Sequence, residues 1–172
     1  KPTAYDLQPN GATEVGVMLI RCLFRTLKLF LEHKIQKHIP IGHALVPWLL
    51  EHTALLLNVK TRGQDGLTAW ARVRGRPFSQ QLLCYAEQVL HKLPSKGPSS
   101  QPDGNMGARW LEGIFIGYDR SSRTYKILTE AGLERARSIQ RRPEPNRLSK
   151  QQIAQMKATP WSQREVRTPE VR

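Results

Sequence analysis

Residues 109–142 read RWLEGIFIGYDRSSRTYKILTEAGLERARSIQRR, and this stretch decides the expected fold. Three strand-like runs, 109–118, 124–129 and 133–141, are separated by the short segments DRSSR and EAG. Runs of β-branched and aromatic residues bounded by turn residues are typical of antiparallel strands. The pattern predicts a meander that closes into a small barrel. Because side chains alternate along a strand, Arg135, Arg137 and Arg141 would share one face of the last strand.

The chain before this stretch is expected to be mainly helical. Residues 14–39 contain no proline and carry apolar residues at helical spacing, which predicts one long helix. Residues 44–58 predict a second helix that packs on the first, and 68–73 a short helical stretch. Residues 82–93 offer further strand-like runs. The expected fold class is therefore α+β, with two packed helices followed by a small SH3-like β-barrel and a tail.

Composition divides the chain into three parts. Residues 1–78 form the helical part, and 79–142 form the barrel. Residues 94–108 are rich in Pro, Gly and Ser, which predicts a flexible insertion within the barrel part. Residues 143–172 hold four prolines and several cations, so we expect an extended basic tail with at most a short helix near 150–157.

The balance of charge indicates a polyanionic partner. The 172 residues include 27 Lys and Arg against 14 Asp and Glu, a net charge of +13. Such a field attracts DNA, and RNA as a second possibility. The longest apolar stretches are interrupted by Arg21, Arg25 and Lys28, which excludes a membrane-spanning segment. Cys22 and Cys84 have no CxxC spacing and fit a reducing compartment.

Two groups of cations are candidate DNA-binding residues. Arg21, Arg25 and Lys28 follow Glu14 at offsets of seven, eleven and fourteen, which places all four on one helical stripe. The second group is a run of four arginines within eight residues, suited to phosphate contact. Its members are Arg135, Arg137, Arg141 and Arg142. The alternatives left open are a solvated helix face and, for Glu14, an ordinary first-turn glutamate stabilised by the helix dipole.

Several segments carry a family resemblance. NGATEV at residues 10–15 heads the long helix, HALVPWLLEHTALLLN follows at 43–58, and GQDGLTAWARVRGRPF follows at 63–78. RWLEGIFIGYDRSSRTYKI lies at 109–127 and GLERARSIQRRPEPNR at 132–147. In this order they resemble copia-type LTR retrotransposon integrases: the NGxxER signature, the DGxTxYExxxGxxP stretch, and the GxFxGY barrel segment with its arginine-rich exit strand. The chain departs from the pattern where it has Val15 and Leu148, because relatives usually have Arg and often Trp there.

The resemblance implies a polynucleotidyl transferase with an RNase H-like core, in which two Asp and one Glu hold two Mg²⁺ or Mn²⁺ ions for DNA integration. Glu14 matches the Glu, as catalytic residue and metal ligand. The Asp partners are missing, because Asp6 is too close to Glu14 and Asp65, Asp103 and Asp119 follow it. We therefore expect no cofactor and no strand transfer for this chain alone. By resemblance, the intact parent would act in the nucleus.

Other interpretations remain open at this point. A non-enzymatic nucleic-acid-binding remnant differs from the integrase interpretation only in the missing carboxylates. A ribosomal component would fit the charge but leave the order of the segments unexplained. The chain begins with Lys1, so we expect a piece of a longer protein. If the core sheet is missing, the apolar back of the long helix should be partly uncovered, which predicts self-association.

Overall fold

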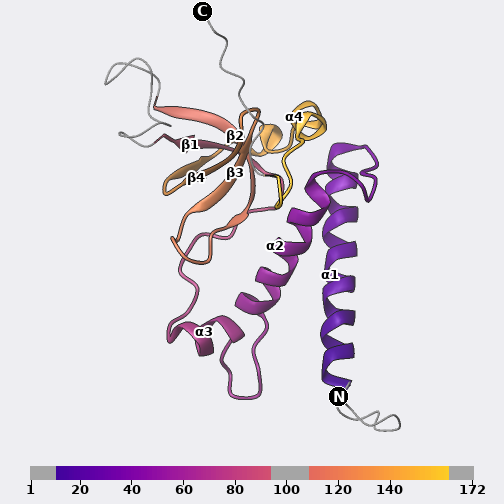
Figure 1. Ribbon diagram of the computed structural model, residues 1–172, viewed down its shortest axis with the longest axis vertical. Coiled ribbons are helices and arrows are strands. Elements are labelled where there is room, and N and C mark those ends of the chain that lie inside the picture. The colour runs from indigo at the N-terminus through magenta and orange to yellow at the C-terminus, as the bar shows by residue number, and fades with distance from the viewer. Residues whose placement is uncertain (1–10, 94–108, 163–172) are drawn as a thin grey trace, which may run out of the picture.

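The computed structural model describes residues 11–93 and 109–162 and has the expected α+β class (Figure 1). The predicted insertion at 94–108 lies outside the described residues. The helices are α1 (Gly11–Ile35), α2 (Leu45–Lys60), α3 (Ala69–Arg74) and α4 (Lys150–Gln155), with a 3-10 turn at Glu144–Asn146. The strands are β1 (Gln88–Lys92), β2 (Trp110–Tyr118), β3 (Tyr125–Thr129), β4 (Gly132–Ala136) and β5 (Ile139–Arg141). They form one antiparallel sheet in the order β4-β3-β2-β1-β5.

The long helix α1 ends at Ile35, four residues before the predicted end. Gln36 takes the left-handed conformation with φ 52°, which stops the helix. Glu32 then holds the turn, because its Oε1 accepts a hydrogen bond from the backbone N–H of Ile39 at 2.7 Å. The same carboxylate pairs with Lys28 at 2.6 Å. These contacts direct the chain back so that α2 can run beside α1 (Figure 1).

A first hydrophobic core joins the helices to the sheet and to the C-terminal segment. Figure 1 shows α1 beside α2, with α4 near the start of α2 and the sheet to one side of it. Buried side chains from all of these elements meet there: Leu31, Ile35, Trp48, Leu49, Ile114, Ile116, Leu128, Ile153 and Met156. The Trp48 Nε1–H donates to the carbonyl oxygen of Ala158 at 2.9 Å. The short helix expected near 150–157 is confirmed as α4, but for residues 143–162 the predicted extended tail is wrong, because their apolar side chains complete this core.

A second core lies on the other side of the strands. Phe115 and Ile127 from the sheet are fully buried there with Leu55 and Val59 of α2 and with Leu83. Residues Gly113–Tyr118 of β2 are therefore buried without interruption. A strand buried on both faces reads as a continuous apolar run, as GIFIGY does here.

The predicted last strand, 133–141, is two strands at opposite edges of the sheet. β4 pairs with β3 and β5 pairs with β1, and among the described strands no ladder joins β4 to β5. The closed barrel expected from the sequence is therefore wrong, and the sheet is open. Only Arg137 and Ser138 link the two edges. In a flat sheet, β4 and β5 would lie four strand spacings apart, about 19 Å. The three peptide units from Ala136 to Ile139 span at most about 11 Å, so the sheet must curl strongly to bring its two edges together.

This break separates the arginines that were expected to share one strand face. Arg135 lies on β4, Arg141 ends β5, and Arg137 stands in the link between them. The expectation of a shared face is wrong, because the two halves of the run pair with different neighbours. Residues 137 and 138 leave the β4 ladder to reach the opposite edge.

Candidate nucleic-acid interface

The stripe predicted on the long helix is present on α1. Glu14, Arg21 and Arg25 line one shallow hollow, together with side chains such as Val17 and Met18 between them. Glu14, Arg21 and Arg25 are exposed to solvent, and neither arginine has a carboxylate partner among the described residues. Lys28 differs, since it is half-buried and paired with Glu32. The common stripe is confirmed for three of its four members, whereas their contact with DNA stays a prediction.

The residues around Glu14 do not fit a two-metal site. Within residues 11–93 and 109–162, no three His, Cys, Asp or Glu side chains are grouped as metal ligands. The charged side chains that share the hollow with Glu14 are those of Arg21 and Arg25, which repel a divalent cation. A pair of Mg²⁺ ions needs several carboxylate oxygens, and Glu14 supplies one carboxylate. No metal-dependent step can therefore be derived from the described residues.

Three of the four C-terminal arginines are bound to carboxylates within the fold. Arg135 pairs with Asp119 at 3.1 Å, and Arg142 pairs with Glu112. The Ser121 hydroxyl, neighbouring backbone N–H groups and Arg135 lower the pKa of Asp119 to about 2. Arg137 is exposed and has no side-chain partner among the described residues.

Of these arginines, Arg141 pairs with the most deeply buried carboxylate. Its Nε and Nη2 donate to both oxygens of Glu87, at 2.7 and 2.9 Å. The side chain of Glu87 is completely buried and also accepts a hydrogen bond from the backbone N–H of Cys84. Arg147 lies 3.8 Å from the same carboxylate. Arg141 therefore neutralises a buried charge where β1 and β5 meet, a role that its place in an arginine run did not indicate.

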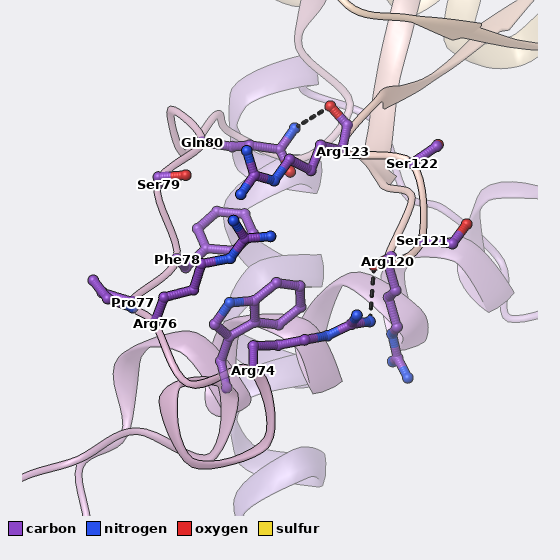
Figure 2. Close-up of a pocket in the computed structure, with 11 residues that line it drawn as sticks. Arg74, Arg76, Pro77, Phe78, Ser79, Gln80, Arg120, Ser121, Ser122 and Arg123 are labelled. Carbon is purple, nitrogen blue, oxygen red and sulfur yellow. Dashed lines mark hydrogen bonds between the residues drawn. The ribbon is translucent and has the colours of Figure 1, made fainter.

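A second hollow is lined by residues that the sequence did not predict as a site (Figure 2). It lies between the segment that ends α3 and the turn between β2 and β3. Its charged and aromatic lining consists of Trp70, Arg74, Arg76, Phe78, Arg120 and Arg123. The basic character of residues 60–76 and the DRSSR turn were visible in the sequence. Their meeting was not, because it depends on how α3 folds back against the sheet.

Comparisons with known proteins add no relative. Neither a protein-family model, nor a curated protein, nor a solved structure matches the chain. The likeness to copia-type integrases therefore rests on the sequence motifs alone and stays a prediction. None of the helices in the described parts of the chain has the length and apolar character needed to cross a bilayer.

Proposed function

We propose that the chain binds nucleic acid, DNA first, as the C-terminal part of a copia-type retrotransposon integrase that acts in the nucleus. The observation that carries the proposal is the pair Arg21 and Arg25 on α1, which are exposed on one stripe and form no ion pair with a carboxylate of the described residues. Cations already paired within a protein gain little from a phosphate, whereas unpaired ones release counterions when they bind it. The net charge of +13 adds a long-range attraction for polyanions.

The geometry of α1 suits a phosphate backbone. Arg21 and Arg25 are one helical turn apart on the same face of the helix. The following half of α1 packs into the first core through Leu31 and Ile35, so the helix is held at one end and exposed at the other. A rigid element that presents two arginine forks is well suited to bidentate phosphate contact.

The test is duplex binding measured by fluorescence anisotropy at several salt concentrations. The variant Arg21→Gln with Arg25→Gln is compared with the wild type and with a control, Lys34→Gln with Lys37→Gln. The control removes the same charge from the last turn of α1, at Lys34, and from the turn after it, at Lys37, and both lysines are exposed. Each phosphate contact contributes about 0.9 to the slope of log K against log salt, so the arginine variant should lose roughly 1 to 2 from that slope.

The outcomes separate the possibilities. A larger loss of affinity and slope in the arginine variant than in the lysine control supports contact through the α1 stripe. Equal losses in both variants would mean that binding depends on net charge alone, and would refute a specific contact through Arg21 and Arg25. A wild-type chain that does not bind duplex or single-stranded DNA, or RNA, would end the proposal.

In an intact parent integrase, Glu14 would be one of the three catalytic carboxylates. The small curled sheet would be the SH3-like element of that integrase. One carboxylate cannot hold two metal ions, so the chain alone is expected to show no strand transfer with Mg²⁺ or Mn²⁺. Covalent joining of DNA by the purified chain would contradict this. Sequencing the transcript upstream of Lys1 separates the two functions. Two Asp codons at integrase-like spacing favour the integrase, and their absence favours the non-enzymatic remnant.

The exposed apolar side chains of α1 support the expectation of self-association. Val15 is 51%, Leu19 42% and Leu29 64% exposed, and none of the three lines the hollow that holds Arg21 and Arg25. A cluster of this kind on a helix is typical of a surface that another chain covers. Sedimentation velocity across a hundredfold range of concentration tests the expectation. A chain that stays monomeric throughout would refute it.

A further inference from the structure

The second hollow has a volume of about 180 Å³ and lies between two segments distant in sequence (Figure 2). Two hydrogen bonds hold its walls together. Arg74 Nη2 donates to the carbonyl oxygen of Arg120 at 2.9 Å, and Gln80 Nε2 donates to that of Arg123 at 3.1 Å. By the same measure, roughly 10–15 Å³ is enough for one water molecule. The folded chain therefore holds open a space that can accept a group larger than water.

The lining of this hollow is strongly positive. Among the described residues, those that line it include Arg74, Arg76, Arg120 and Arg123, and none is Asp or Glu. The acidic residues near these segments along the chain are engaged elsewhere. Asp119 pairs with Arg135, and Asp65 pairs with Arg72 at 2.6 Å. Guanidinium groups that lie close together repel each other, and an anion bound among them would offset that repulsion.

Aromatic rings form part of the lining of the hollow, next to the arginines. The rings of Trp70 and Phe78 meet edge to face with centroids 5.1 Å apart, and Phe78 packs in the same way on Tyr118 at 5.3 Å. The guanidinium of Arg74 lies 5.3 Å from the centre of the Trp70 ring. In the view of Figure 2, Arg76 and Arg123 extend toward each other from the two walls. An apolar floor lowers the local dielectric constant and strengthens the attraction for an anion.

We propose that this hollow is a binding site for a phosphate group, supplied by the backbone of the nucleic acid. The guanidinium fork matches the oxygens of phosphate, and arginines from two walls can hold one group from both sides. The nucleic acid as the source of that phosphate rests on the proposed function above. The site itself rests on the hollow, its charge and its aromatic floor. It would fix the position of the strand without specifying sequence, since phosphate contacts position and base contacts specify.

The experiment compares the variant Arg76→Gln with Arg123→Gln against the control Lys37→Gln with Lys92→Gln. All four side chains are exposed and lack a side-chain partner among the described residues, so neither variant removes a contact that holds the fold. Thermal stability is followed with inorganic phosphate against chloride at equal ionic strength. Duplex affinity is followed by anisotropy over a salt series. We expect the arginine variant to lose the phosphate-induced rise in Tm and to bind duplex about tenfold more weakly than the control, with a salt slope lower by about 1.

Each result bears on the site. Loss of both the phosphate response and the duplex affinity supports a site for backbone phosphate. If only the phosphate response is lost, the site stands and free phosphate is its source. If the wild type responds to phosphate but binds no nucleic acid, the site stands and the proposed function fails. If the arginine variant matches the control in both assays, the hollow is no phosphate site, whatever the outcome for α1.

Discussion

Replacing Arg141 with glutamine should destabilise the fold rather than weaken DNA binding selectively. The Glu87 carboxylate is completely buried, and Arg141 donates two hydrogen bonds to it. Removing one partner of a buried ion pair costs about 3–5 kcal/mol, because the remaining charge is left without compensation. Two features reduce that figure. The Arg141 side chain is 30% exposed, and Arg147 remains 3.8 Å from Glu87. We therefore expect a loss of about 2 kcal/mol.

Urea unfolding, monitored by tryptophan fluorescence, measures this loss. For a chain of this size a loss of about 2 kcal/mol corresponds to a fall in Tm of about 4–8 °C. Arg137→Gln is the matched control, because Arg137 has the same charge and is exposed, with no side-chain partner among the described residues. Its effect on stability should stay within about 0.5 kcal/mol. Adding Glu87→Gln to Arg141→Gln should restore part of the stability, since no buried charge then remains.

The binding assay provides the refutation. If Arg141 acts through Glu87, both single variants should weaken duplex binding by the same small factor, because each removes one positive charge. If Arg141→Gln is as stable as Arg137→Gln but binds duplex far more weakly, the structural role is wrong and the original prediction of a DNA contact is right.

Three further predictions concern stability in urea. Burial lowers the pKa of His52 to about 4, so the folded state favours the neutral imidazole. The free energy of unfolding is therefore highest above pH 6.5 and falls by about 3 kcal/mol as the pH drops toward 4. His52→Leu should reduce the pH dependence of stability by that amount, and an unchanged profile would contradict it. Gly113→Ala would place a Cβ 2.3 Å from a methyl carbon of the buried Ile127 and should cost about 1–3 kcal/mol, so neutral behaviour would refute the close approach. Trp48→Phe removes the donor to the Ala158 carbonyl and should cost about 2–3 kcal/mol, and a cost below 1 kcal/mol would mean that this contact contributes little.

Local patterns in the sequence predicted most of the elements. The helices expected at 44–58 and 68–73 correspond to α2 and α3, and the first two strands of the meander correspond to β2 and β3. These segments have a clear apolar period or clear turn residues, so short-range information is enough. The end of α1 was missed by four residues, because Gln36 is not a residue that usually marks a helix stop.

Long-range pairing was not predictable from the same patterns. The run at 133–141 has the composition of a single strand, and its division depends on which edge of the sheet each half can reach. The residues around Ile153 look like a polar tail because only a few are apolar, yet those few fill the first core beside Trp48. Burial of a short segment depends on what the rest of the fold leaves open, which composition does not record.

The sequence also could not predict which cations are available to bind a phosphate. It gives the number of cations, whereas the structure shows which of them are already neutralised by carboxylates. Arg135, Arg141 and Arg142 are paired with carboxylates around the sheet, so their positive charge is largely compensated within the fold. Arg21 and Arg25 are not compensated in this way by the described residues, and the sequence placed these two correctly on one stripe.

Two groups of arginines have no carboxylate partner among the described residues, Arg21 with Arg25 on α1 and the arginines of the hollow beside α3. Arg21 and Arg25 lie near the middle of α1, and the arginine-lined hollow lies beside α3. Figure 1 places α3 and the start of α1 toward the same end of the long axis, away from α4. Because exposed charges farther apart than about 8–10 Å are largely screened at physiological salt, the internal ion pairs at the sheet add little to this field. We expect a polyanion to contact the arginines of α1 and those of the hollow together, because both groups lack carboxylate partners among the described residues.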